Sequence, residues 1–251
     1  NVFPIIMGRS HAGGRKNVRR AQRGKSSNKS NDLVVISSSA AVSYLLKASP
    51  SNPVRIMSQT LSKRERILVV GCGDFSWPLS VAAHIGGSNL TATSLDSAEE
   101  LSEKYGQAVA FNCQALKRLS ATVFHEIDGC YLKRHFPSTN FDRIIFNFPH
   151  VGGSTSSDVA KNRELIEKFI RSCREIISKK GGLVSISLRT TLFYKSWDLP
   201  SLVKRIGAGA HIVSETPFDQ FAGYKPQRTH PGVYHAAPSV ADASVYTIGF
   251  S

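Results

Sequence analysis

The chain has 251 residues, of which 41% are apolar and 20% charged, and its net charge at pH 7 is +14. This length suits one large domain, or one domain with an extension, and the apolar fraction allows an ordinary core. No stretch approaches the roughly 20 consecutive apolar residues of a membrane-spanning helix. The four cysteines stand far apart, without a C-x-x-C pair, so neither a metal site nor a disulfide framework is expected.

Most of the positive charge lies in the first quarter of the chain. Residues 1–66 hold 13 of the 32 Lys and Arg residues but only 2 of the 18 acidic ones, which leaves +11 there and +3 in residues 67–251. We assign residues 1–65 to a basic N-terminal extension and linker, and residues 66–251 to a folded domain. A basic block of this kind is either a solvated tail or an arm that neutralises phosphates. We expect the second, with RNA as the partner.

The side chains of the extension that are expected to contact RNA are Arg9, Arg15, Lys16, Arg19, Arg20, Arg23 and Lys25. The extension is rich in Arg and Ser and poor in acids, a composition typical of organelle-targeting and organelle-ribosomal segments. A mitochondrial, ribosome-associated location is therefore expected, with the nucleolus as the alternative.

Residues 33–48 are mildly apolar and predict a short strand or helix before a proline-containing linker. From Arg66 onward, short apolar runs alternate with segments of helical length. The runs that predict strands cover residues 67–70, 89–94, 121–124, 141–147, 182–188, 210–215 and 243–250. One helix is predicted over 97–119 with Ser97 as its cap, and another over 158–179 with Ser157 or Asp158 as its cap.

Strands that alternate with helices indicate right-handed crossovers and an α/β fold, with helices on both faces of the sheet. The seven strands, the last two of them forming a hairpin, fit the class I methyltransferase form of the Rossmann fold. The prediction is thus a seven-stranded, mostly parallel sheet preceded by the basic extension.

A loop of sequence Gly71-Cys72-Gly73-Asp74 follows the first of these strands. Ligands of such sheets bind at the carboxyl ends of the strands, and glycines there allow the backbone to approach a ligand closely. The third glycine of the dinucleotide fingerprint is absent, because Ser76 stands in its place. A carboxylate at Asp74 would repel a pyrophosphate, but it suits an amino or sulfonium group such as those of S-adenosylmethionine (SAM). On its own, the loop is equally consistent with a plain turn.

Two further aspartates follow predicted strands. Asp96 stands 23 residues after Gly73, close to the roughly 20-residue spacing at which an acid binds ribose hydroxyls. In the same pocket, Asp128 would reach the adenine edge. The alternatives are that Asp96 caps the following helix and that Asp128 belongs to a turn beside Gly129.

The run Asn147-Phe148-Pro149-His150 ends the fourth strand. A polar residue, an aromatic ring and a proline at this place are typical of methyltransferases that act on bases, in which the amide holds the acceptor and the ring stacks on the base. Asn147, Pro149 and His150 are therefore the candidate catalytic residues, with His150 as a possible general base. The alternative is a plain turn before a flexible loop.

Several stretches, taken together, resemble one family, the fungal large-subunit ribosomal RNA uridine-N3 methyltransferases, over roughly residues 66–230. They are ILVVGCGDFSWPLSVA, NLTATSLDSAEEL, FDRIIFNFPHVGG, SLRTTLFYKSWDL and PFDQFAGYKPQRT. The resemblance implies a class I fold, SAM as cofactor, SAM contacts at Gly71, Gly73, Asp96 and Asp128, and the target base near residues 147–150. The chain departs from the family pattern at Arg189-Thr190-Thr191, at Phe193 and at Pro226-Gln227-Arg228-Thr229.

Two hypotheses follow. In the first, the protein methylates ribosomal RNA, and Arg189 and Arg228 join the extension in binding phosphates. In the second, it is an inactive methyltransferase-fold component of a ribosome or of its assembly, with ribosomal RNA and ribosomal proteins as partners. A NAD-dependent oxidoreductase is disfavoured, because the fingerprint glycine is missing and the NFPH run has no role in it.

Overall fold

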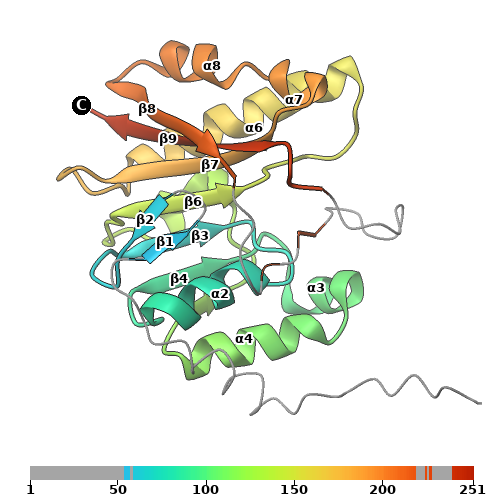
Figure 1. Ribbon diagram of the computed structural model, residues 1–251, viewed down its shortest axis with the longest axis vertical. Coiled ribbons are helices and arrows are strands. Elements are labelled where there is room, and N and C mark those ends of the chain that lie inside the picture. Colours follow the sequence, from blue (N-terminus) through green and yellow to red (C-terminus); the bar gives the residue numbers. More distant parts are fainter. Residues whose placement is uncertain (1–53, 57–58, 219–223, 225, 228–238) are drawn as a thin grey trace, which may run out of the picture. The chain divides into compact units, whose positions relative to one another are not determined.

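A computed structural model of the chain describes residues 54–56, 59–218, 224, 226–227 and 239–251 (Figure 1). The predicted element over 33–48 and all seven RNA-binding side chains predicted in the extension lie outside the described residues, as does Arg228.

The described domain is built on a seven-stranded sheet with the order β5-β4-β3-β6-β7-β9-β8. Its strands are β3 (Ile67–Val70), β4 (Leu90–Thr93), β5 (Thr122–Phe124), β6 (Arg143–Asn147), β7 (Leu183–Arg189), β8 (Ala210–Pro217) and β9 (Ala243–Phe250). The first five pair in parallel, whereas β9 runs antiparallel to both β7 and β8. This is the sheet of the class I methyltransferase fold. The predicted strands, and the pairing of the last two, are confirmed.

Both faces of the sheet are covered (Figure 1). Helices α2 (Ser76–Ile85), α3 (Ala98–Tyr105) and α4 (Ala108–Arg118) contribute to one apolar core, and α5 (Leu132–His135), α6 (Ser156–Arg174) and α8 (Leu199–Ile206) to another. Along β3, residues 67 and 69 enter the first core and residues 68 and 70 the second, because side chains of a strand alternate between faces. The continuous apolar run of β3 follows from this double burial.

The helix predicted over 97–119 is two helices. Ser97 caps α3 as expected: its Oγ accepts from the Glu100 N–H at 3.2 Å, and Glu100 Oε2 accepts from the Ser97 N–H at 2.8 Å. The helix then ends at Gly106, which has a φ of +72°. A left-handed residue cannot continue a right-handed helix, so the chain turns and α4 begins at Ala108.

The helix predicted over 158–179 is shifted toward the N-terminus. Helix α6 begins after Thr155, whose N–H and Oγ1 both donate to Asp158 Oδ2 at 2.9 and 2.7 Å. Beyond Arg174 the chain leaves the helix to pair with Phe141. The Phe141 N–H donates to the Ile176 carbonyl at 2.8 Å, and the Ser178 N–H donates to the Phe141 carbonyl at 2.7 Å. Periodicity alone does not reveal this competing pairing.

Two shorter elements complete the description. Strands β1 (Val54–Ile56) and β2 (Gln59–Leu61) form an antiparallel pair within the segment predicted as a linker. The 3-10 turn η1 (Gly129–Tyr131) precedes α5, and α7 (Leu192–Lys195) follows β7. Of the helices that the structure describes, none combines the length and the apolar character that crossing a membrane requires.

Candidate functional site

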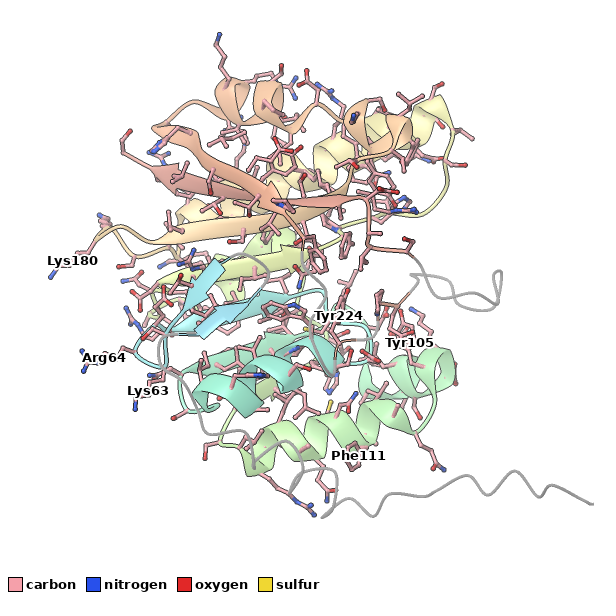
Figure 2. All side chains as sticks on the ribbon, viewed as in Figure 1. Lys63, Arg64, Tyr105, Phe111, Lys180 and Tyr224 are labelled. Carbon is pink, nitrogen blue, oxygen red and sulfur yellow. The ribbon has the colours of Figure 1, made fainter. Side chains whose placement is uncertain are left out.

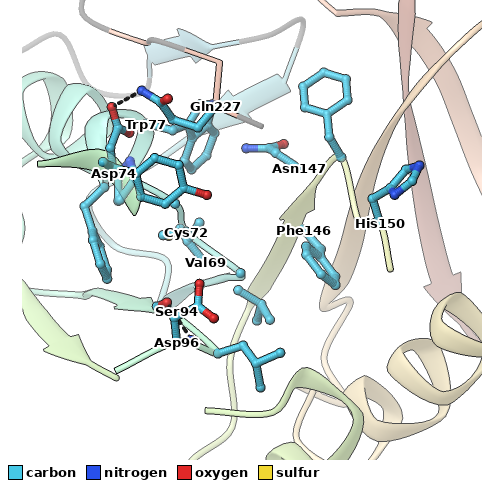
Figure 3. A pocket seen from close by; sticks show the side chains of 18 of the residues that line it. Val69, Cys72, Asp74, Trp77, Ser94, Asp96, Phe146, Asn147, His150 and Gln227 are labelled. Carbon is cyan, nitrogen blue, oxygen red and sulfur yellow. Dashed lines mark hydrogen bonds between the residues drawn. The ribbon is translucent and has the colours of Figure 1, made fainter. Parts of the chain in front are cut away.

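A cavity of about 500 Å³ opens at the carboxyl ends of β3, β4 and β6 (Figure 3), a volume within the range of small-molecule sites. The predicted site residues that line it are Gly71, Gly73, Asp74, Asp96, Asn147 and His150. They come from three loops that the parallel strands bring to one edge. The other lining residues include Tyr105 and Tyr224, which lie at this same edge (Figure 2).

Both glycines of the first loop lie against neighbouring side chains, and the contact at Gly71 excludes a β-carbon. Gly71 has a φ of +68°, and a β-carbon there would overlap Cε2 of the Phe146 ring. A β-carbon on Gly73 would lie 3.2 Å from Gln227 Cβ and 3.3 Å from Tyr105 Cζ. Without β-carbons, the loop can lie against these side chains while both glycines line the cavity.

The Asp74 carboxylate is buried and organises the loop. Its Oδ1 accepts from the Ser76 N–H at 3.0 Å at the start of α2, and its Oδ2 accepts from Gln227 Nε2 at 2.7 Å. Its own carbonyl accepts from Asn112 Nδ2 at 2.7 Å. Gln227 stands 153 residues away in the sequence, so no local pattern predicts this bond. Asp74 is thus both a structural cap and a negative charge in the cavity wall.

Asp96, at the end of β4, lines the cavity and forms an ion pair of 2.8 Å with Lys104 Nζ of α3. Lys104 also lines the cavity and was not among the predicted site residues. Burial, together with the charges of Asp96 and Asp74, raises the pKa of the neighbouring Tyr105 to about 12. The phenol therefore stays protonated at neutral pH, and its hydroxyl can donate to a ligand.

Asp128 is not among the residues that line the cavity. Its Oδ1 accepts from the Cys130 N–H at 2.8 Å and so caps η1, as in the alternative of a turn beside Gly129. Next to Asp96, the cavity instead has an apolar wall at Leu95, a residue that is 63% exposed. An apolar surface beside an acid suits an adenine ring next to its ribose.

The NFPH run leaves β6 in a constrained conformation. Asn147 Oδ1 accepts from Ser187 Oγ of β7 at 2.8 Å. Phe148 has a φ of +55°, and its ring packs 4.9 Å from that of Phe218 between centroids. Pro149 does not line the cavity. The side-chain oxygen of Asn147 is therefore held by a defined partner at the cavity.

His150 lies among the rings of Phe193, Tyr194 and Trp197, with centroids 6.1, 5.8 and 5.5 Å away. Its Nδ1 accepts from the Gly152 N–H at 2.7 Å. Because a backbone amide can only donate, the neutral ring carries its proton on Nε2. Taking up a second proton would require Nδ1 to give up this bond, so the geometry argues against His150 as a general base and favours it as a donor from Nε2.

Arg189, the described residue among those predicted to bind RNA, ends β7. It does not line the cavity, and its guanidinium carbon lies 6.0 Å from the centroid of the Tyr194 ring. Arg189 therefore lies at the edge of the sheet where β6 also ends, since β6 and β7 are parallel.

The cysteines are poor nucleophiles. Burial raises the pKa of Cys72 and Cys173 well above the ordinary value, that of Cys130 to about 12 and that of Cys113 to about 11. A thiolate is the reactive form of cysteine, so covalent catalysis by these residues is not supported. Within the described ranges, no group of three His, Cys, Asp or Glu side chains is placed to hold a metal ion.

The residues of the cavity fit SAM. Gly71 and Gly73 line the cavity without side chains of their own, and Asp74 offers a carboxylate to a cationic group. Asp96 and Leu95 offer an acceptor and an apolar wall to a ribose and its base. A pyrophosphate fits less well, because it would lie against the Asp74 carboxylate.

The chain is similar in sequence to a methyltransferase family and to several individual proteins. The model of the family "rRNA (uridine-N3-)-methyltransferase BTM5-like" matches residues 68–228. An uncharacterized protein of Arabidopsis thaliana is 34% identical over 68% of this chain and 85% of its own length. The 25S rRNA (uridine(2634)-N(3))-methyltransferase of Saccharomyces cerevisiae is 24% identical over 67% of each chain.

Other relatives share only part of their length with this chain. The heavy metal-associated isoprenylated plant protein 41 of Arabidopsis thaliana is 38% identical over 57% of this chain, which is 29% of its own length. Among solved structures, TrmN from Thermus thermophilus aligns with a TM-score of 0.47 at 19% identity, over 84% of this chain and 48% of its own. This likeness is too distant to bear on function.

Proposed function

Since the chain belongs to the rRNA (uridine-N3-)-methyltransferase BTM5-like family, we propose that it methylates a uridine of ribosomal RNA at N3, with SAM as the methyl donor. The observation that carries the proposal is the cavity itself. It joins a glycine-rich loop with two acids to the Asn147 loop, and all of these residues lie within the matched range. The fold alone would not identify an activity, because function depends on the site.

The cavity residues divide into two groups. The backbone at Gly71 and Gly73, with the carboxylates of Asp74 and Asp96, would hold SAM, and Asn147 and His150 would face the acceptor base. When bound, SAM supplies a methyl group whose bonding electrons stay with sulfur as the acceptor nitrogen forms the new N–C bond. Catalysis by the chain then consists of positioning and of hydrogen bonds to developing charge.

The base must leave its stack to enter such a cavity. His150 can donate from Nε2 to a carbonyl oxygen of a uracil ring, and the proton of N3 would pass to water. Arg189 and the basic extension would bind phosphates, which fixes the RNA in place without reading its sequence. We propose a ribosome-associated, mitochondrial location on the composition of the extension alone.

A second function is favoured by a specific observation. Both carboxylates that would hold SAM already have protein partners: Asp74 is bonded to Gln227 and Asp96 to Lys104. A protein that no longer binds SAM would tolerate such pairs. It would then act as an RNA-binding component of a ribosome or of its assembly.

One experiment separates the two functions. The full chain is incubated with tritiated SAM and unmodified large-subunit ribosomal RNA made by transcription in vitro, and the digested nucleosides are analysed for 3-methyluridine. In parallel, SAM binding is titrated by calorimetry. Asp96→Asn should weaken SAM binding, whereas Glu99→Gln, which alters a nearby exposed acid of α3, should not. If SAM does not bind and RNA does, the protein is the non-enzymatic component.

A further inference from the structure

Ser187 is a fully buried polar residue in the middle of the sheet. It is the register partner of Asn147 in the parallel pairing of β6 and β7, so the two side chains project to the same face. A buried hydroxyl destabilises a protein unless it is hydrogen-bonded. The bond of 2.8 Å from Ser187 Oγ to Asn147 Oδ1 meets this requirement, which explains a serine at this position.

This bond also sets the direction of the Asn147 amide. A carboxamide has an acceptor oxygen on one side and a donor nitrogen on the other. Because Ser187 holds Oδ1 on the side of β7, Nδ2 points into the cavity (Figure 3). Among the residues that the structure describes, Nδ2 has no hydrogen-bond partner, so its N–H groups face the space where an acceptor base would lie.

We propose that Ser187 is a positioning residue, which holds Asn147 so that the cavity offers an N–H donor to a carbonyl oxygen beside the reacting nitrogen. The inference rests on the proposed function and extends it to a choice of acceptor. When an imide nitrogen loses its proton to water, the remaining electron pair is shared with the flanking carbonyl oxygen, and Asn147 Nδ2 donates to that oxygen.

The same orientation disfavours another class of acceptor. An exocyclic amino group, as in adenine or cytosine, would bring its N–H groups against those of Asn147. The donor therefore selects bases in which the ring nitrogen carries a proton between or beside carbonyl groups. Without Ser187, the amide would turn freely and this selection would be lost.

The first test is a double-mutant cycle on methyl transfer to unmodified ribosomal RNA. Ser187→Ala should lower kcat by about 10- to 100-fold, because a misplaced donor should cost less than the roughly 100- to 1,000-fold loss that follows removal of a donor to developing charge. The Kd for SAM should stay unchanged. In an Asn147→Ala background, Ser187→Ala should have no further effect. If the two effects multiply instead, Ser187 does not act through Asn147 and the proposal is overturned.

Two further variants separate positioning from stability. Ser185→Ala removes another fully buried serine hydroxyl of β7, two residues away, and should leave kcat unchanged. Ser187→Thr keeps the hydroxyl and should recover most of the activity. If Ser185→Ala lowers kcat as much as Ser187→Ala does, the effect is one of strand stability and the inference fails.

The second test does not depend on turnover. In ¹⁵N-labelled protein, the side-chain amide resonances of Asn147 should shift in Ser187→Ala, and uridine 5′-monophosphate should move them in the wild type more than cytidine 5′-monophosphate does. Unchanged Asn147 resonances in Ser187→Ala would overturn the orientation claim. A wild type that shows the shifts but transfers no methyl group would refute the proposed function and leave the orientation standing.

Discussion

Gly71→Ala tests the link between the glycine loop and the core beneath it. The β-carbon would be placed at a φ of +68° and against the Phe146 ring. That ring is packed edge-on against Phe169 with centroids 5.0 Å apart, so it cannot withdraw into the core without displacing a buried residue. Alternatively, the Phe146 ring can turn into the cavity, which it already lines.

The cost has two parts of known order. A left-handed conformation costs an L-residue roughly 1–2 kcal/mol, and forcing an extra methyl group into a packed region costs about 1–3 kcal/mol more. Gly181→Ala is the matched control, because Gly181 has a φ of +79° and nothing within 4 Å of its would-be β-carbon. Lys180, its neighbour, lies at the edge of the sheet opposite Tyr105 (Figure 2). The difference between the variants isolates the overlap with Phe146.

Denaturant unfolding and calorimetric titration with SAM give the two readouts. Gly71→Ala should lose about 1–3 kcal/mol more stability than Gly181→Ala. If the ring instead moves into the cavity, a penalty of the same size appears in SAM binding, a weakening of about 5- to 150-fold. Equal stability of the two variants, together with unchanged SAM affinity, would refute the reasoning.

Three other predictions concern charges and thiols. Lys104→Ala frees Asp96 from a partly exposed ion pair and should tighten SAM binding by up to about fivefold at low salt. The control Glu103→Ala should leave SAM binding unchanged. A weaker affinity for SAM in Lys104→Ala would show instead that Lys104 helps to hold the ligand. Hydrogen bonds from Arg205 and Arg171 lower the pKa of Glu167 below 4.5, so its contribution to stability is present above that pH and is lost as the pH falls through the folded-state pKa. Glu167→Gln should therefore be less stable than the wild type at neutral pH, and its free energy of unfolding should fall less steeply as the pH is lowered. Parallel curves of unfolding free energy against pH for the two proteins would contradict this. Because burial raises the pKa of all four thiols, the native protein at pH 8 should react with Ellman's reagent far more slowly than the unfolded chain. Rapid reaction of all four thiols in the native protein would contradict this.

The sheet could be predicted from the sequence because its strands are buried on both faces. The run of residues 67–70 is apolar throughout, because helices cover both faces of the sheet. In the sequence, the segments that form these helices separate one such run from the next. Helix ends were harder to predict, because they depend on distant residues. The C-terminal end of α6 is set by pairing with Phe141, and the break at Gly106 depends on a left-handed conformation that the sequence allows but does not impose.

The same distinction holds for the candidate site. Residues that follow strands, such as Gly71, Asp96 and Asn147, could be predicted to meet, because parallel strands end at one edge. The partners of these residues could not. Lys104 reaches Asp96 from the end of a helix, and Gln227 reaches Asp74 from a segment 153 residues away. Asp128 differs from these residues: it follows a strand as expected, but its carboxylate caps its own loop.

The position of β9 has a consequence for how the protein is made. It is the last strand of the described chain, yet it lies inside the sheet, between β7 and β8. During synthesis, the N-terminal strands emerge first, and until residues 243–250 leave the ribosome, β7 has one unpaired edge and β8 has no partner in the sheet. Unpaired edges invite association with other chains. A nascent chain arrested before β9 should therefore be a target for chaperones, and the sheet is completed only when its final strand inserts.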